Sequence, residues 1–335
     1  MKMNEIFCDG LILQANKPVR IFGSGNGTVT VTIGGKSATA TAEGERWLVE
    51  LPSFDYGGPY TLVANLNGTE ETVQDVWFGD VYLASGQSNM QLKLDETNTP
   101  KEHYRTNDSL RLFSTDRVFE DEDYFHARDK WVRADKETVA HWTALGYLCA
   151  KFVHEKTGHK VGVIACYQGA ALIQSWLPKG ILLGTPCEPA AEEHSIAMRV
   201  QDYLAWNRDG NLYTAQFCPL VPFSMKAVLW YQGEGNSREP DGHYYEGMLT
   251  MLIQRWRQDL QDAKLPFLVI QLADHFHPEV DRELWCNVKQ AQQNVANALP
   301  DVYLVKCDDI CENDDIHPKT KLPLAERMTE VLLTL

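Results

Sequence analysis

A run of apolar residues that ends in a tight turn is the feature that most limits how this chain can fold. Residues 80–84 (DVYLA) predict a buried strand, and residues 85–90 (SGQSNM) follow it directly. In α/β folds a strand that leads through a small turn into a helix exposes a serine at the helix N-terminus, where backbone N–H groups stabilise negative charge. The segment therefore predicts an α/β fold with Ser88 as a candidate nucleophile.

A carboxylate and an imidazole lie together near the end of the chain, in residues 313–318 (NDDIHP). An early serine followed by a late aspartate and histidine is the chain order of a serine hydrolase outside the trypsin and subtilisin types. His317 is the expected general base. Asp314, three residues earlier, is favoured as the residue that orients its imidazole, and Asp315 is the competing candidate. The alternative interpretation of this acidic run is a solvated loop.

The first 77 residues consist of short strand patterns separated by turns. Residues 29–33 (VTVTI) alternate apolar and polar side chains, and Gly34-Gly35 follows them as a hairpin signal. Further strand patterns lie at 37–41, 47–51, 60–64 and 71–76. This spacing is typical of a small β-sandwich or jelly roll. Residues 1–77 are therefore predicted to form an all-β domain without catalytic residues.

From about residue 78 onward, strand and helix patterns alternate. Strand patterns lie at 81–85, 110–114, 161–167, 227–231, 267–272 and 302–307. Between them, apolar residues at helical spacing cover 145–153, before Gly158, and 248–256. The alternation predicts a parallel sheet covered by helices on both faces, within a second domain over 78–335.

The carboxyl ends of these strands are the expected location of the functional site. Ligands of open α/β sheets bind beyond the carboxyl ends of the strands. Ser88, Gly169 and Gln232 each follow a strand pattern closely. They are therefore expected to converge at one edge of the sheet.

Three separated motifs resemble the sialate O-acetylesterase family of the SGNH (GDSL-like) hydrolases. They are residues 86–90 (GQSNM), 230–234 (WYQGE) and 314–318 (DDIHP), and residues 11–19 are similar to the start of those enzymes. The resemblance covers most of the chain. It implies a flavodoxin-like, three-layer α/β/α SGNH domain after the β-domain, and a serine carboxylic-ester hydrolase that uses no cofactor.

The resemblance also implies an oxyanion hole built from backbone and side-chain donors. Ser88 and Gly169 would each contribute a backbone N–H. Relatives tend to have Gly-Gly-Thr where this chain has Gly169-Ala170-Ala171, so only the first glycine of the block is kept. The loss of the second glycine leaves open which N–H points inward, and the alternative interpretation of Gly169 is a simple turn.

A side-chain amide from the third motif would complete the oxyanion hole. Gln232 is preferred over Asn236 because it lies nearer the strand end. Glu234 could support the histidine or orient the loop, or it could lie on the surface. Trp176 and Trp285 are candidate walls of a sugar-binding pocket, with core packing as the alternative.

Composition limits the partners and the location of the chain. The 335 residues carry a net charge of −15, which argues against a nucleic acid or an anionic membrane as partner. No apolar run approaches the ~20 residues that span a bilayer. The first residues lack the apolar core of a signal peptide, so a cytoplasmic location is expected, with a secreted or periplasmic one open if the sequence is trimmed. A homo-oligomer is also open.

A metal site is not expected. Cys307 and Cys311 flank the acidic loop, but no second Cys/His pair has suitable spacing. A nucleophile, a base and an oxyanion hole leave a metal no necessary role in ester hydrolysis. Activity is therefore expected to survive EDTA.

The resemblance implies a carbohydrate O-acetylesterase that works through an acyl-serine intermediate. Its implied substrate is a 9-O-acetylated sialic acid, with acetylated xylan or another acetylated polysaccharide as the runner-up. A carbohydrate-binding relative without activity is disfavoured because Ser88, Asp314 and His317 are all present. A thioesterase or lipase is a third alternative, and a lipase is disfavoured because no long apolar lid is evident.

Overall fold

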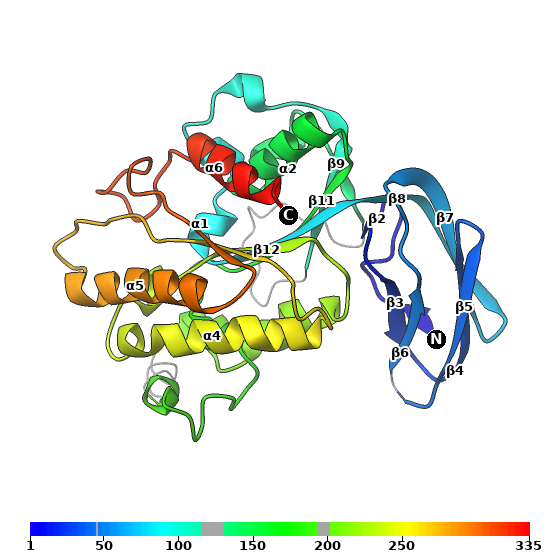
Figure 1. Ribbon diagram of the computed structural model, residues 1–335, viewed down its shortest axis with the longest axis horizontal. Coiled ribbons are helices and arrows are strands. Elements are labelled where there is room, and N and C mark those ends of the chain that lie inside the picture. The colour runs from blue at the N-terminus through cyan, green and yellow to red at the C-terminus, as the bar shows by residue number, and fades with distance from the viewer. Residues whose placement is uncertain (45, 116–129, 193–201) are drawn as a thin grey trace.

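A large, mostly parallel sheet forms the centre of the computed structural model, which describes residues 1–44, 46–115, 130–192 and 202–335 (Figure 1). The strand order is β10-β9-β11-β8-β12-β13-β14. β10 is antiparallel to β9, and the remaining neighbours are parallel. The strands are β8 (Thr69–Gly86), β9 (Asn107–Ser114), β10 (Val132–Ala134), β11 (Val161–Tyr167), β12 (Ala227–Tyr231), β13 (Phe267–Ile270) and β14 (Val302–Val305).

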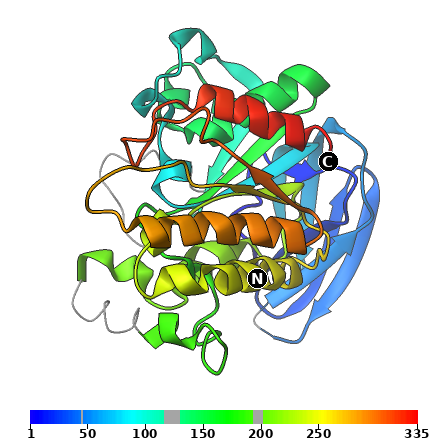
Figure 2. The same ribbon diagram turned by 60° about the vertical axis from the view of Figure 1, so that its left-hand side comes forward.

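Helices cover both faces of this sheet. α2 (Ala144–Thr157) and α6 (Leu322–Leu332) lie on one face, and α4 (Asp241–Asp259) and α5 (Arg282–Ala298) lie on the other (Figures 1 and 2). The predicted three-layer α/β/α arrangement is therefore confirmed. Among the described residues, no helix combines the length and the apolar character needed to cross a bilayer.

The central strands form because their residues are apolar on both sides. Every residue of β11 and β12 is buried, as expected for parallel strands that have helices on both faces. The sequence predicted the bounds of both strands correctly. The helix before β11 also ends where predicted, because Gly158 takes the left-handed conformation (φ 74°) that glycine adopts without strain.

The N-terminal region contains two antiparallel sheets (Figure 1). β1 (Lys2–Met3), β3 (Val19–Ser24) and β6 (Arg46–Leu51) form one sheet. β4 (Gly27–Ile33), β5 (Lys36–Ala42) and β7 (Gly57–Leu66) join the first half of β8 in the other, and β2 (Ile12–Gln14) pairs parallel to β8. The alternation predicted over 29–33 is confirmed, since Val29, Val31 and Ile33 are buried and the two threonines between them are not.

Strand β8 belongs to both regions. Its first half pairs antiparallel with β7, in a register that runs from Thr69 opposite Leu66 to Phe78 opposite Gly57. From Asp80 to Gly86 it pairs parallel with β11 in the central sheet. The predicted boundary between residues 77 and 78 thus falls inside one continuous strand, and the division into two domains stays a prediction.

A buried carboxylate on β8 fastens the N-terminal region to the central sheet. Asp80 is fully buried and accepts a hydrogen bond from the Tyr56 hydroxyl at 2.9 Å. Its carboxylate also lies 3.0 Å from Lys226 Nζ and 3.0 Å from His159 Nδ1. Tyr56 comes from the N-terminal region and stacks on His159 with ring centroids 3.5 Å apart. A buried carboxylate with several partners of this kind contributes to stability mainly because losing it leaves those partners unpaired.

Replacing this carboxylate is expected to destabilise the fold without affecting a site at the opposite edge of the sheet. Asp80→Asn should lower the free energy of unfolding by about 1–3 kcal/mol, measured as a lower urea midpoint at unchanged slope. The control is Glu50→Gln, which removes an exposed ion pair with Arg20 and should cost less than about 1 kcal/mol. Equal losses in the two variants would contradict the role given to Asp80.

Candidate active site

The turn that presents Ser88 depends on a close approach between β8 and β12. Gly86 ends β8 with φ +129°, and a Cβ placed there would lie 2.1 Å from the Tyr231 carbonyl oxygen. Glycine is therefore the residue that this position accepts. Gln87 N–H donates to the same carbonyl at 2.9 Å, and the four-residue helix α1 (Ser88–Gln91) begins immediately afterwards. Ser88 is thereby placed at the carboxyl edge of the sheet.

The structure brings Ser88 and His317 into direct contact. Ser88 Oγ and His317 Nε2 are 2.8 Å apart. His317 lies on the loop between β14 and α6, 229 residues away along the chain. Its side chain is half-buried. A neutral imidazole that accepts the serine proton at Nε2 carries its own proton on Nδ1, which is the tautomer a general base needs.

The two candidate carboxylates are placed differently. Asp315 Oδ1 accepts the backbone N–H of His317 at 2.8 Å. Asp314 is exposed, and among the described residues neither carboxylate forms an ion pair with the imidazole. Burial and His277 lower the pKa of His275, while the charges of Asp315 and Asp314 oppose this shift. Among the described residues, no hydrogen bond or ion pair between Asp314 and His317 supports the preference for Asp314 that was predicted from the sequence.

The surroundings of His317 favour its neutral form. Burial lowers the pKa of His317 below its ordinary value of 6.5. The positive charges of Lys319 and Lys321 act in the same direction, while Asp315 and Glu96 oppose them. A lowered pKa keeps the imidazole unprotonated, and therefore able to accept a proton, at and below neutral pH.

Gly169 lies beside Ser88, but its N–H is already engaged. A Cβ built on Gly169 would sit 3.9 Å from the Ser88 Cβ atom, so the predicted convergence of these residues is observed. The Gly169 N–H donates to Gln91 Oε1 at 2.7 Å. The Ser88 N–H, in contrast, has no protein acceptor among the residues that the structure describes. Of the two predicted backbone donors, Ser88 is the available one in this arrangement.

The amide of Gln232 is also committed to protein partners. Gln232 is fully buried, and its Nε2 lies 3.2 Å from Gln87 Oε1, 3.1 Å from the Ala171 carbonyl and 2.6 Å from Asn236 Oδ1. Its Oε1 accepts from the Tyr245 hydroxyl at 2.8 Å. An amide NH₂ has two protons to donate, so Gln232 offers none to a substrate here. This differs from the predicted role as oxyanion donor.

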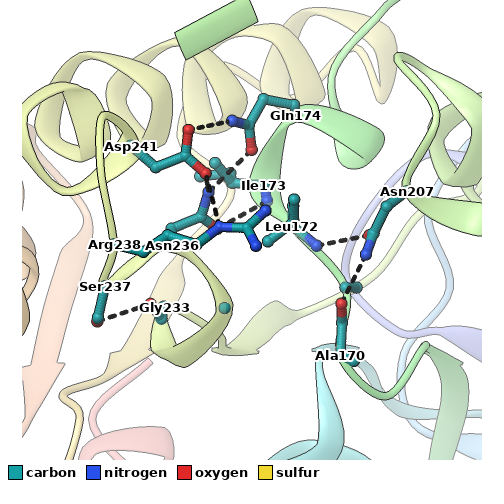
Figure 3. Close-up of polar contacts among 12 residues, drawn as sticks. Ala170, Leu172, Ile173, Gln174, Asn207, Gly233, Asn236, Ser237, Arg238 and Asp241 are labelled. Carbon is teal, nitrogen blue, oxygen red and sulfur yellow. Dashed lines mark hydrogen bonds and ion pairs between the residues drawn. The ribbon is translucent and has the colours of Figure 1, made fainter. Parts of the chain in front are cut away.

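The alternative donor, Asn236, lies in the buried network that Figure 3 shows. Its Nδ2 donates to Gln174 Oε1 and to Asp241 Oδ2, each at 2.8 Å. Its Oδ1 accepts the Ile173 N–H at 3.0 Å. Asn236 is fully buried, so it supports the loops behind Ser88 and presents no free N–H.

A neighbouring asparagine holds the loop that carries Gly169. Asn207 is buried, donates to the Ala170 carbonyl at 2.8 Å and accepts the Leu172 N–H at 2.8 Å (Figure 3). Ala170 has a positive φ of 54°, a conformation that non-glycine residues adopt only when the surroundings hold it. The block that replaces Gly-Gly-Thr is thus fixed by side-chain hydrogen bonds.

The two tryptophans predicted to line a pocket have different environments. Trp176 is fully buried against Trp230 and Trp256, with ring centroids 6.3 and 6.2 Å away, so its prediction as a pocket wall is wrong and the core alternative holds. Trp285 lines a small cavity together with His275 and Asp315, next to the His317 loop. This tryptophan remains a candidate wall of the site.

Three side chains that lie near Ser88 were not predicted from the sequence to belong to the site. Gln91 holds Gly169, and Asn89 and Lys321 meet behind the serine through a hydrogen bond of 2.8 Å. Asn89 and Gln91 follow Ser88 so closely that their polar character could have been read as part of the site. Lys321 gave no such signal, because lysine is almost always exposed and nothing in its local sequence predicts burial.

Glu234 is a half-buried residue of the site. Its Oε2 is buried, its Oε1 accepts from Asn89 Nδ2 at 2.5 Å, and it lines the cavity that Trp285 also lines. The surface alternative for Glu234 is therefore wrong.

Among the described residues, no three His, Cys, Asp or Glu side chains group as metal ligands.

Comparisons with known proteins show the family to which this chain belongs. A family model described as carbohydrate esterase, sialic acid-specific acetylesterase, matches residues 78–334. The chain is similar to sialate O-acetylesterases of Mus musculus (27% identity, covering 92% of this chain and 68% of the relative) and Homo sapiens (27%, 92% and 65%). It therefore spans about two thirds of the length of these relatives.

Solved structures show the same fold. A carbohydrate acetylesterase from Xanthomonas citri superposes with a TM-score of 0.81 at 29% identity, over 98% of this chain and 73% of that protein. A protein from Arabidopsis thaliana, at 18% identity and a TM-score of 0.51 over 76% of this chain and 98% of its own, shares the fold. The family predicted from the three motifs is thus confirmed, and the chain belongs to the carbohydrate esterases described as sialic acid-specific acetylesterases.

Proposed function

We propose that this chain is a carbohydrate O-acetylesterase that hydrolyses acetyl esters of sugars through an acyl-serine intermediate. The observation that carries the proposal is the 2.8 Å contact between Ser88 Oγ and His317 Nε2, at the carboxyl edge of the sheet of a carbohydrate esterase. A serine hydroxyl needs an adjacent base to act as a nucleophile. The neutral imidazole of His317 is that base.

The reaction proceeds in two acyl transfers. Ser88 Oγ attacks the acetyl carbonyl carbon while His317 Nε2 takes the hydroxyl proton. The tetrahedral intermediate then collapses, the sugar oxygen leaves with the proton from His317, and an acetyl-serine remains. A water molecule, deprotonated by the same imidazole, attacks the acetyl-serine and releases acetate and free Ser88.

The backbone supplies the stabilisation of the oxyanion. The Ser88 N–H is unoccupied by protein acceptors in the described residues, and it adjoins the carbon under attack. Gln91 Oε1 accepts the Gly169 N–H and so holds Gly169 next to Ser88. A shift of the Gln91 side chain on substrate binding would free a second donor. Gln232 and Asn236 act as buried supports of these loops.

The proposed substrate is an acetylated sialic acid, because the family description and the names of the relatives specify sialate. An acetyl ester of a neutral sugar is a second candidate, and the charge of the site favours it. Asp314 is exposed beside the site, and Asp315 lines the adjacent cavity. Negative charge at the entrance is unfavourable for the carboxylate that sialic acid carries.

The nucleophile is tested by removing its hydroxyl. Ser88→Ala should lower kcat for p-nitrophenyl acetate by at least about 10³-fold and abolish labelling by a fluorophosphonate probe, with an unchanged thermal unfolding midpoint. Ser85→Ala, in the strand that leads to Ser88, is the matched control and should keep near-normal activity. Labelling of Ser88→Ala at the wild-type level would refute the assignment.

The sugar is tested by acetate release from three acetyl esters. The substrates are 9-O-acetyl sialic acid, its neutral methyl ester and an acetylated xylo-oligosaccharide. A sialate esterase should give the highest kcat/KM with the free acid, because a specific site compensates the carboxylate. A preference for the methyl ester or the xylo-oligosaccharide would point to the neutral-sugar alternative.

The pH dependence and the two aspartates are tested together. The base must be neutral, and the pKa of His317 is lowered, so kcat/KM should rise with pH through an inflection below 6.5 and then level off. Asp315→Asn removes a charge that raises this pKa, so the inflection should move to lower pH. The amide oxygen of asparagine can still accept the His317 N–H, so kcat should change little in this variant. Asp315→Ala removes the acceptor of that N–H and should lower kcat by about tenfold or more.

Asp314→Asn is the matched control for this experiment, since it removes the same charge one residue away. It should leave both the inflection and kcat near their wild-type values. A large loss of activity in Asp314→Asn with little change in Asp315→Ala would instead assign the orienting role to Asp314.

A further inference from the structure

A lysine is fully buried directly behind the proposed nucleophile. Lys321 is the last residue before α6, and none of its surface is exposed. Its Nζ donates to Asn89 Oδ1 at 2.8 Å and lies 5.1 Å from the centre of the Tyr231 ring. Burying an ammonium group is costly unless it is paired and hydrogen-bonded, so a lysine in this position requires a specific role.

The amide of Asn89 connects Lys321 to two other parts of the site. Asn89 Nδ2 donates to Glu234 Oε1 at 2.5 Å and to the Ile316 carbonyl at 2.9 Å. Its Oδ1 accepts from Lys321. Three partners thus fix the orientation of one amide. Asn89 follows Ser88, and Ile316 precedes His317, so this amide ties the serine turn to the histidine loop.

Two ionisable side chains lie on either side of this amide. The half-buried Glu234, whose Oε2 is buried, is bonded to one side of Asn89, and Lys321 is bonded to the other. Burial raises the pKa of Glu234, while the bond from Asn89 and the charge of Lys321 oppose this shift. Burial lowers the pKa of Lys321, and the neighbouring Cys311, Cys307 and Glu234 oppose it. Asn89 therefore stands between a buried lysine and a carboxylate whose charge, when ionised, favours the charged form of that lysine.

We propose that Lys321 is a positioning residue of the esterase, which fixes the Asn89 amide so that the bond to Ile316 keeps His317 Nε2 over Ser88 Oγ. The inference rests on the proposed function. Without Lys321, Asn89 Oδ1 loses its donor, and the amide is free to rotate away from Ile316. The histidine loop then loses its bond to the serine turn, and the 2.8 Å contact is no longer maintained.

The test compares Lys321→Met with Lys319→Met. Both lysines lower the pKa of His317, against Asp315 and Glu96, but only Lys321 bonds Asn89. Both substitutions should therefore move the inflection of kcat/KM to higher pH. Lys321→Met alone should lower kcat and the rate constant of fluorophosphonate labelling about 10- to 100-fold, with KM nearly unchanged and every molecule still labelled at saturation. A purely structural role would instead lower the labelled fraction.

A double variant keeps the test decisive if Lys321→Met does not fold. Lys321→Met/Glu234→Gln removes both buried charges and leaves neither unpaired, so it should unfold near the wild-type temperature. Its kcat and its rate constant of fluorophosphonate labelling should still be lowered by the factor given for Lys321→Met. Wild-type labelling rates in this double variant, or in a folded Lys321→Met, would overturn the inference. A wild-type protein that neither cleaves p-nitrophenyl acetate nor labels at Ser88 would refute the proposed function itself.

Discussion

The contact between the backbones of β8 and β12 at Gly86 is the constraint on which the site depends. The register of the parallel strands places Gly86 level with both Tyr167 and Tyr231. The segments after these strands therefore begin at the same edge. Because no side chain fits between Gly86 and the Tyr231 carbonyl, the turn to Ser88 can press directly against its neighbour. As a result, Ser88, the loop that carries Gly169 and the buried amide of Gln232 lie close to one another.

Behind this edge, the protein uses polar side chains where a core would normally be apolar. Gln232, Asn236, Gln174 and Asp241 satisfy one another while fully enclosed. In a low-dielectric interior such a network is favourable only when every member is paired, and it then fixes a single arrangement of the loops. The rigidity required for catalysis comes from residues that need not touch the substrate.

Most of the fold and part of the site could be predicted from the sequence. Two-sided apolar runs predicted β11 and β12 to the residue, because periodicity and burial are local signals. The directions of amide groups are not local. Gln232 and Asn236 were placed next to the site correctly, yet their donors are taken by partners from distant segments. Trp176 faces the core because Trp230 and Trp256 surround it, and the buried Lys321 donates to Asn89, which lies 232 residues away along the chain. Only the assembled structure brings those partners together.

The continuity of β8 has a consequence for how this chain can vary in length. The strand spans Thr69–Gly86, and side chains on a strand alternate between faces. One inserted or deleted residue that is not absorbed as a bulge would turn every later side chain to the opposite face. The reversed side chains would lie in the N-terminal region or in the segment that leads to Ser88, depending on which end of β8 keeps its register. Length changes should therefore accumulate in the loops around β8, and an exchange of the two regions between relatives would have to preserve this strand intact.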